Sequence, residues 1–473
     1  MIKFTPLSGD VMKIHEYIKD CPNFCDLTLG VKYIWRDEFR IDYAIYNDTL
    51  ILRESCKDYD NAFYFPIGKD ELGALLEIEK YCLENGQPLK FCLLTEEQKT
   101  FLANRYENTK EYFIRDWSDY IYEAESLKNL VGKKYNGQRN HINKFKKLYS
   151  GYEVSEIKEA DLPLIAEFLI LFERGTDFSV WSEREEEIKV FDYIKKCFFF
   201  NQAGANMLGA KIIVDGKVVA ISVGEIRGDT IYIHVEKALK EYAGVYPVMS
   251  NEFLKIFCTD EVKFVNREED CGDLGLRTSK TQYHPIEIKN KYIVEIITAF
   301  YRANKPINIS TDELTITNYK KDDMSEYLKL ATDDELNKLW GYDYKEDIGD
   351  NEPNEEYFYS FITGLIKKGE EVPLAVKLGD KLIGELTLYS FGFYNDCEIG
   401  YRFLREYQGK GYARKSASAL IDYVYNRLGI KTIKSNCFKE NARSKNLIEK
   451  LGFVYREEDE KKFYFTHKNK NHY

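Results

Sequence analysis

A short turn near the C-terminus, Gln408–Gly411, has the composition of an anion-binding loop. Before it, apolar residues alternate with polar ones from Cys397 to Phe403, which is the period of a β-strand. After it, apolar residues recur at spacings of three and four as far as Leu428, which is the period of an amphipathic helix. Glycines let the backbone approach a ligand closely, and the first N–H groups of a helix point toward it. The pattern therefore predicts a phosphate-binding site between a strand and a helix.

The turn and its surroundings resemble the GNAT acetyltransferases. The segment Q-G-K-G-Y-A at 408–413 matches their Q/R-x-x-G-x-G/A motif, and E-I-G-Y at 398–401 resembles the strand before it. Downstream, N-A-R-S at 441–444 and E-K-L-G-F at 449–453 resemble the last helix and the strand that follows it. The four segments occur in the order of that family. The resemblance implies a GNAT fold that uses acetyl-CoA as acyl donor and an amine of a small molecule or protein as acceptor.

The resemblance also implies roles for individual residues. The pyrophosphate of acetyl-CoA is expected on the N–H groups at the start of the helix, and the pantetheine arm is expected to pair with the preceding strand like an added strand. Asn441 is expected to bind the pantetheine, and Ser444 is expected near the thiol. No metal is expected. The expected cofactor-binding residues are Tyr401, Phe403, Leu404, Gln408, Gly409, Lys410, Gly411, Tyr412, Ala413, Asn441 and Ser444.

Acetyl transfer requires a neutral amine, and a lysine-type amine, whose pKa is about 10.4, is mostly protonated at neutral pH. A base is therefore needed, directly or through water. Glu398 stands where several GNAT enzymes place a catalytic glutamate, and a surface or ion-paired glutamate is the alternative interpretation. Many members carry a tyrosine acid at the position of Ile448, so the thiolate is expected to be protonated by Ser444, by water or by no specific group. Direct attack in a ternary complex is expected, with Cys437 as the alternative nucleophile of a two-step route.

The N-terminal region contains a second set of ordered motifs. They are D-W-S-D-Y at 116–120, G-K-K at 132–134, Q-R-N-H-I-N at 138–143, V-E-K-A at 235–238, N-R-E-E-D at 266–270 and G-L-R-T-S-K at 275–280. These segments resemble the family built on the C-terminal domain of phosphatidylglycerol lysyltransferases. The resemblance implies a tandem GNAT-like fold. It agrees with a faint repeat, because hairpin patterns recur at 42–53, 209–224 and 374–391.

Length and the faint repeat fit three lobes, and the two resemblances imply them. A chain of 473 residues is too long for one hydrophobic core. We expect an α/β (α+β) protein of tandem GNAT-like lobes, with mixed, mostly antiparallel sheets flanked by helices. The expected domains are 1–115, 116–300 and 306–473, with residues 304–310 as the linker before the third. One continuous helix is expected from Ser126 to Tyr149.

The function of the N-terminal region is open at this point. It can transfer an aminoacyl group from charged tRNA, or serve as a non-catalytic binding module. The basic run from Lys133 to Lys147 suits tRNA phosphates, and one solvated helix face is the alternative. Five charged residues lie at predicted strand ends and loops, and two interpretations are open: they line a cleft, or they form an internal ion-pair network. They are Glu236, Arg267, Glu269, Asp270 and Arg277.

Composition narrows the class of protein. The net charge of −11 argues against broad nucleic-acid coating and weakly favours cationic acceptors. The ten cysteines are scattered and complete no zinc pattern, which is typical of free thiols in a reducing compartment. No apolar run approaches the roughly 18 residues of a membrane span, and the N-terminus lacks a signal-peptide core. These features predict a cytoplasmic enzyme or binding protein, and the sequence indicates no oligomeric state.

Overall fold

The structure is a computed structural model, and it divides into two compact units. The first comprises residues 1–81, 90–101 and 111–294, and the second comprises residues 82–89, 102–110 and 295–473. Side chains at 174–175, 183–185 and 346–347 are not described. The structure describes residues 2–7, 11–19, 21, 24–106, 108–175, 183–341, 344–348 and 352–468.

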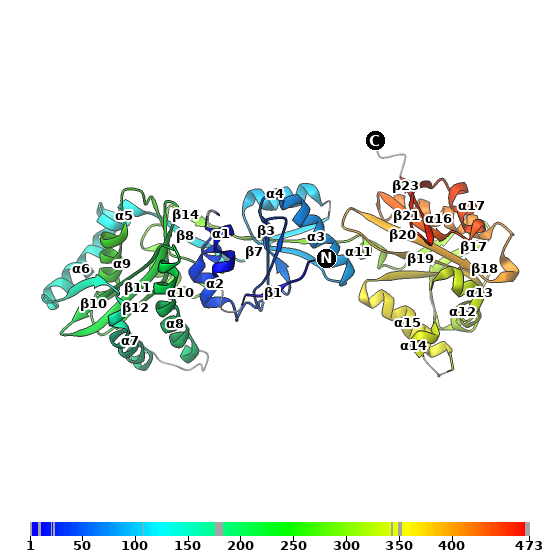
Figure 1. Cartoon of the computed structure of the whole chain (residues 1–473). Coiled ribbons are helices and arrows are strands. Elements are labelled where there is room, and N and C mark those ends of the chain that lie inside the picture. The colour runs from blue at the N-terminus through cyan, green and yellow to red at the C-terminus, as the bar shows by residue number, and fades with distance from the viewer. Residues whose placement is uncertain are drawn as a thin grey trace. The chain divides into compact units, whose positions relative to one another are not determined.

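Three sheets form the framework, as expected (Figure 1). Each sheet contains the same crossover. A strand leads into a helix, and the helix returns to a strand that runs parallel to the first. The repeated crossover explains the faint repeat in the sequence. The three crossovers are β4 (Ala62–Phe63), α3 (Glu71–Glu84) and β6 (Leu89–Leu94); β12 (Thr230–Ala238), α9 (Val245–Phe257) and β13 (Phe264–Asn266); and β20 (Asp396–Phe403), α16 (Tyr412–Asn426) and β21 (Thr432–Phe438).

The first sheet has the strand order β1-β2-β3-β4-β6-β15-β7, with β5 also paired to β3. Its predicted hairpin is confirmed, because Asn47 and Asp48 take the left-handed φ values of 45° and 56° that a two-residue type I′ turn requires. The remaining strands are β1 (Thr5–Pro6), β2 (Asp42–Tyr46), β3 (Thr49–Glu54), β5 (Ile67–Gly68), β7 (Thr109–Phe113) and β15 (Tyr292–Ile296). The accompanying helices are α1 (Met12–Ile18), the short 3₁₀ turn η1 (Cys25–Leu27), α2 (Leu29–Trp35) and α4 (Glu96–Arg105).

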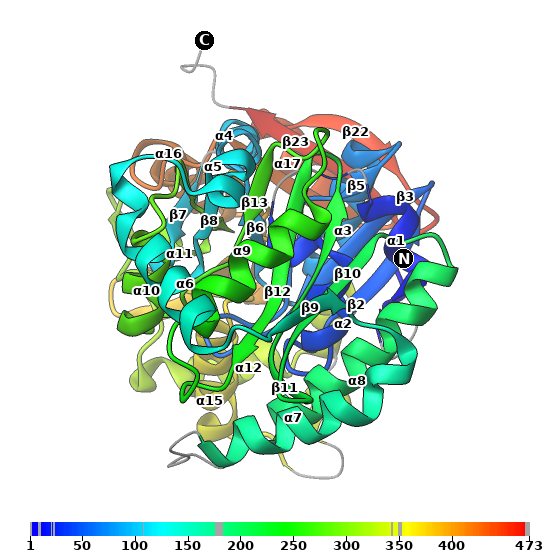
Figure 2. The same ribbon diagram turned by 90° about the vertical axis from the view of Figure 1, so that its left-hand side faces the viewer.

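The second sheet has the strand order β14-β8-β13-β12-β11-β10-β9. Helices α5, α6 and α9 cover one face, and α7 and α8 cover the other (Figure 2). Apolar residues of α1 and α2 join the core on the α7 and α8 face. The strands are β8 (Asp119–Glu123), β9 (Glu153–Glu156), β10 (Met207–Val214), β11 (Lys217–Arg227) and β14 (Glu287–Lys289). The helices are α5 (Ala124–Asn129), α6 (Asn136–Leu148), α7 (Leu162–Gly175), α8 (Glu183–Gln202) and α10 (Leu274–Thr281).

The third sheet has the strand order β16-β17-β18-β19-β20-β21-β23-β22. Helices α16 and α17 pack on one face, and α12 and α15 pack on the other. The remaining strands are β16 (Asn308–Ser310), β17 (Leu314–Asn318), β18 (Glu371–Leu378), β19 (Lys381–Tyr389), β22 (Val454–Glu458) and β23 (Lys462–Lys468). The helices are α11 (Phe300–Ala303), α12 (Met324–Ala331), α13 (Asp334–Trp340), α14 (Tyr344–Ile348), α15 (Glu355–Lys368) and α17 (Ala442–Lys450).

Two expectations about local structure are wrong. The helix expected from Ser126 to Tyr149 is interrupted, because Leu130 adopts a left-handed φ of 49° that ends α5, and Gly132 follows with a φ of 99°. The expected linker at 304–310 is a strand in its second half, because Asn308–Ser310 pairs with β17.

Candidate functional site

The third sheet opens where β20 and β21 separate. The two parallel strands pair at three positions, the last of which is Glu398 opposite Lys434. Beyond Glu398 these two fully described strands have no further register pairs, although β20 continues to Phe403. The second half of β20 therefore leaves backbone groups on its β21 side available to a ligand.

The hydrogen bonds around β20 show which backbone groups face this opening. The N–H of Leu404 donates to the carbonyl of Ile383 on β19 at 3.0 Å, so it is not available to a ligand. Because neighbouring residues of a strand present their backbone groups to opposite sides, the backbone groups of Tyr401 and Phe403 face the opening. The carbonyl of Phe403 accepts a hydrogen bond from the side chain of Gln408 at 3.0 Å. Of the three expected pantetheine-pairing residues, Tyr401 fits, Phe403 fits through its N–H, and Leu404 does not.

The glycine turn leads directly into the N-terminus of α16. Gly409 and Gly411 have left-handed φ values of 74° and 86°, and a Cβ atom added at either would meet nothing within 4 Å. Across the described part of the chain, no acceptor receives the N–H groups of residues 409–414. Lys410, exposed like the two glycines, adds positive charge, while Tyr412 and Ala413 are half-buried. This open cluster of N–H groups at a helix N-terminus fits a phosphate.

The equivalent turn of the second sheet is closed. Gly244, which precedes α9, has a similar φ of 90°, but a Cβ atom there would lie 2.4 Å from the carbonyl oxygen of His141. Helix α6 therefore covers this helix start with its backbone. Of the two turns, that of the third sheet is the one that can admit a phosphate.

Helix α17 brings two expected residues to the α16 face of β20. The side chain of Asn441 caps the helix by accepting a hydrogen bond from the N–H of Ser444 at 3.0 Å. The hydroxyl of Ser444 lies 2.9 Å from that of Tyr401. Burial raises the pKa of Tyr401 to about 12, so the phenol stays protonated. This Tyr401–Ser444 pair was not expected, since it joins a strand to a helix. Ile448, at the position where a tyrosine acid is common, lies in the core.

Glu398 lies on the opposite face of β20, at the last paired position before the opening. Its Oε1 accepts a hydrogen bond from the amide of Asn436, and this amide also donates to the hydroxyl of Tyr389 at 3.3 Å. Burial and a hydrogen bond to Glu398 raise the pKa of Tyr389, which therefore stays protonated. Within the described residues, no basic side chain lies within 4.0 Å of Glu398, so the ion-paired interpretation does not hold. Glu398 is an oriented, unpaired carboxylate.

The alternative nucleophile is poorly placed. The Cys437 side chain belongs to the apolar core beneath α16 and α17, with 5% of its surface exposed. Burial raises the pKa of its thiol, which disfavours the reactive thiolate. These features favour direct attack over a two-step route.

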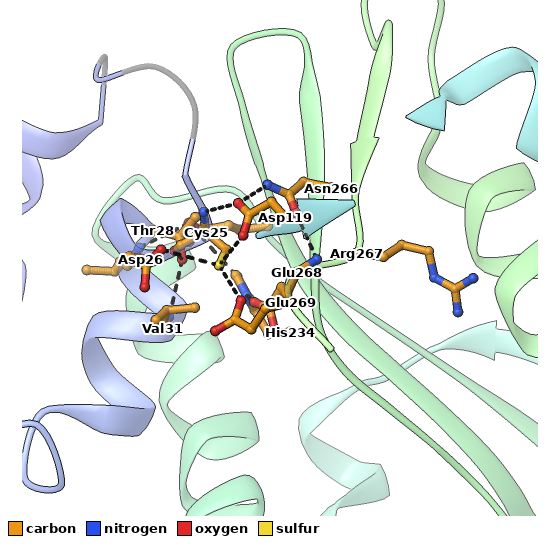
Figure 3. A network of polar contacts seen from close by, with 12 residues as sticks. Cys25, Asp26, Thr28, Val31, Asp119, His234, Asn266, Arg267, Glu268 and Glu269 are labelled. Atoms are coloured by element: carbon orange, nitrogen blue, oxygen red, sulfur yellow. Dashed lines mark hydrogen bonds and ion pairs between the residues drawn. The ribbon is translucent and has the colours of Figure 1, made fainter. Parts of the chain in front are cut away.

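The first unit contains a buried charged network, shown in Figure 3. The ammonium group of Lys291 lies 2.7 Å from Asp119 and 3.6 Å from Glu269, and it also pairs with Asp26. The thiol of Cys25 lies 3.0 Å from Glu269 and 3.2 Å from Asp119. The ligand atoms of Cys25, Asp119 and Glu269 lie within 4.8 Å of one another, a spacing that also suits a metal ion. Here the ammonium of Lys291 already supplies the positive charge.

Electrostatics in this network follow from burial and close charges. Burial, followed by the nearby carboxylates, raises the pKa of Cys25 well above its usual value, so the thiol stays protonated. Burial also raises the pKa of Glu269 to about 7, against the opposing effect of Lys291. His234 lies beside the network, with its Nδ1 2.7 Å from Glu268. Asp119 and Glu269 fall in motifs noted in the sequence, whereas Cys25 and Lys291 carried no signal there.

The charged set expected in the N-terminal region forms internal ion pairs. Arg267 pairs with Glu236 at 3.0 Å, and Figure 3 shows its side chain pointing away from Cys25. Arg277 pairs with Asp270 at 2.8 Å and with Asp116 at 2.6 Å. Of the two interpretations, these contacts favour the ion-pair network over a cleft.

The basic run is partly committed to local contacts. Arg139 donates to the carbonyl of Gly132 at 2.8 Å, and Lys146 pairs with Glu252 at 3.2 Å. Four other lysines of the run are exposed: Lys133, Lys134, Lys144 and Lys147.

Among the described residues, no helix combines the length and apolar composition needed to cross a bilayer.

Comparison with known proteins identifies the two parts. Residues 313–454 match the acetyltransferase (GNAT) domain, and residues 23–295 match the family described as phosphatidylglycerol lysyltransferase, C-terminal. The chain is 24% identical to an uncharacterized protein of Mycoplasmoides gallisepticum, over 52% of this chain and 79% of that protein. It is 32% identical to the uncharacterized N-acetyltransferase YnaD of Bacillus subtilis over 83 residues, which are 18% of this chain and 49% of YnaD. A crystal structure of a conserved Bacteroides thetaiotaomicron protein of unknown function matches with a TM-score of 0.55 and 27% identity, covering 62% of this chain and 99% of that one.

The open sheet, the glycine turn and the GNAT match define the C-terminal part as an acyltransferase domain of the GNAT class. The larger match covers residues 23–295, more than half of the chain. The chain belongs to the family of the phosphatidylglycerol lysyltransferase C-terminal domain, here joined to a GNAT domain. Both expected resemblances are thereby confirmed.

Proposed function

We propose that the C-terminal domain transfers an acetyl group from acetyl-CoA to an amine by direct attack in a ternary complex. The observation that carries this proposal is the position of Glu398, an unpaired carboxylate at the point where β20 and β21 separate. A base at this point lies beside the strand opening, where an acyl group held along β20 would meet an amine from the other face.

Each reacting group has a candidate partner in this chain. The N–H groups of residues 409–414 would hold the pyrophosphate, and the backbone of Tyr401 and Phe403 would pair with the pantetheine. A backbone N–H facing the opening would also stabilise the oxyanion formed when the thioester is attacked. Ser444, hydrogen-bonded to Tyr401, would protonate the departing thiolate. We also assign residues 1–115, 116–300 and 306–473 to three domains.

The proposal is tested by measuring acetyl-CoA binding and acetyl transfer to an amine. Calorimetric titration with acetyl-CoA should show binding, and a thiol assay should show CoA release when primary amines are added. Mass spectrometry should find the acetyl group on the amine and none retained on the protein. The absence of acetyl-CoA binding would refute the donor, and a stable acetyl-protein would refute direct attack.

A second candidate function concerns residues 1–300, for which we propose aminoacyl transfer from charged tRNA. It is supported by the family match and by the exposed lysines Lys133, Lys134, Lys144 and Lys147. Neutralising these four lysines should weaken tRNA binding and flatten its salt dependence. If the full chain binds no charged tRNA at low salt, a non-catalytic binding module is the remaining interpretation.

A further inference from the structure

Two carboxylates lie in one row across the third sheet. Glu371 of β18 pairs in register with Tyr389 of β19, and Tyr389 pairs with Glu398 of β20. Directly opposed residues of antiparallel strands project from the same face. Because neighbouring strands lie about 4.8 Å apart, the backbones of the two glutamates are about 10 Å apart, with the tyrosine between them.

Neither carboxylate has a positive partner within the protein. Throughout the described chain, no Lys, Arg or His nitrogen lies within 4.0 Å of Glu371 or Glu398. The contrast is Glu385, on the same face, which pairs with Arg402 at 3.4 Å and accepts a hydrogen bond from Tyr319 at 2.9 Å. The protein therefore neutralises one carboxylate of this face and leaves two unneutralised.

The surroundings of Glu371 make a positive ligand favourable. Burial and the charge of Glu385 raise its pKa to about 7, whereas the hydroxyl of Thr387, 3.4 Å away, and Arg402 act in the opposite direction. The neighbouring charge of Glu370 adds to the rise. A partly buried carboxylate without a counter-ion is costly, and a cation bound beside it removes that cost.

An aromatic ring lies next to the row. Gly400 follows Glu398 on the same face, and a Cβ atom there would lie 3.0 Å from the indole of Trp340. The lack of a side chain at Gly400 lets the indole approach the sheet closely. The Arg402 guanidinium lies over the face of this indole, with its Cζ 4.9 Å from the ring centroid, so the ring edge near Gly400 is the apolar surface that an alkyl chain beside the row would meet.

We propose that the acceptor is an amine with a second ammonium group on the same aliphatic chain, and that Glu371 binds this second ammonium while Glu398 receives the reacting nitrogen. This inference rests on the proposed acetyl transfer. The reacting ammonium first gives one proton to Glu398. Its nitrogen then forms the N–C bond as the thioester C–S bond breaks. Ser444 gives its hydroxyl proton to the thiolate, and the second proton of the nitrogen restores the hydroxyl. The products are the N-acetyl amine, CoA thiol and one proton, which Glu398 releases.

The test compares 1,4-diaminobutane with n-butylamine, which lacks only the second ammonium. The wild-type protein should have the higher kcat/KM for the diamine. Glu371→Gln should lower kcat/KM for the diamine about 10- to 100-fold, the range for a charge-assisted hydrogen bond, and change the value for butylamine less than about threefold. The preference of the wild type for the diamine should rise as the pH increases through about 7, because Glu371 then ionises, and the variant should lose this dependence.

Two further variants complete the design. Glu371→Asp keeps the charge and should retain a preference for the diamine. The control is Glu460→Gln on the exposed β22–β23 turn, which should leave kcat/KM unchanged for both amines. The inference would be overturned if Glu371→Gln lowered kcat/KM equally for both amines, or if the wild-type protein had the same kcat/KM for both. Either result would leave the proposed acetyl transfer intact. If the wild-type protein acetylates neither amine nor any other primary amine, acetyl transfer itself is refuted.

Discussion

Replacing Glu398 with glutamine tests the base directly. Glutamine keeps the size of the side chain and a carbonyl oxygen that can accept the hydrogen bond from Asn436, but it cannot accept a proton. No ion pair is lost, because the described residues place no basic group within 4.0 Å of Glu398. The fold and the donor site should therefore be preserved. A positioned general base contributes about 10²- to 10⁴-fold in rate, which corresponds to roughly 3 to 5.5 kcal/mol.

Three measurements distinguish the loss of a general base in Glu398→Gln from a structural change. We expect kcat for 1,4-diaminobutane to fall about 10²- to 10⁴-fold in Glu398→Gln. The Kd for acetyl-CoA, measured by calorimetry, should not change, because the glycine turn and the backbone of Tyr401 and Phe403 are untouched. The residual rate should rise close to tenfold per pH unit up to the amine pKa of about 10.4, since only amine that is already neutral reacts.

The control is Glu460→Gln, which removes one exposed carboxylate outside the site and should match the wild type. A fall of less than about tenfold in the Glu398 variant would exclude a general base at this position. A large fall in acetyl-CoA affinity would instead show that Glu398 supports the donor site, and the assignment of the base would be wrong.

Three other predictions follow from the structure. Gly411→Val should abolish acetyl-CoA binding in calorimetry, because a side chain would fill the open space before α16, and the left-handed φ of 86° should cost about 1–2 kcal/mol of stability. Lys291→Met should lower the free energy of unfolding by about 3–5 kcal/mol in a urea titration, because it leaves buried carboxylates unpaired, whereas Lys133→Met should change it by less than about 0.5 kcal/mol. Burial opposes ionisation of Asp270, but the hydrogen bond and charge of Arg277 outweigh burial and lower the pKa of Asp270. The ionised carboxylate therefore stabilises the fold above its unfolded pKa of about 3.9, and this stabilisation is lost as the pH falls below that value. The unfolding free energy of Asp270→Asn should decline less between pH 5 and pH 2 than that of the wild type.

Local patterns predicted most of the third sheet. The strand before the glycine turn, the helix after it and the hairpin at 374–391 lie where the sequence patterns placed them. The break near Leu130 was missed because the apolar spacing continues across it and leucine rarely adopts a left-handed φ, although Gly132 is of a type that commonly marks a helix end. The strand at Asn308–Ser310 was missed for a related reason, since its residues have little strand preference and depend on β17 for pairing.

The parts of the site that depend on register were not accessible from the sequence. Glu371 and Glu398 share a row only because of the register in which β18, β19 and β20 pair. A shift of one strand by one residue would move its glutamate to the opposite face of the sheet. The contact between Cys25 and Lys291, at 3.3 Å, joins residues 266 positions apart in the chain. Such contacts belong to the tertiary fold, and no short motif encodes them.

The two glycine turns show why the donor site belongs to the third sheet. The segments E-Y-A-G-V-Y at 241–246 and E-Y-Q-G-K-G-Y at 406–412 are similar, and in both a left-handed glycine precedes the crossover helix. A glycine motif alone would therefore support a phosphate site in either place. The carbonyl of His141 closes the first turn, whereas the second faces open space and leaves its N–H groups without acceptors in the described structure. What decides between them is the packing around the helix start, because an anion requires both free donors and room to reach them.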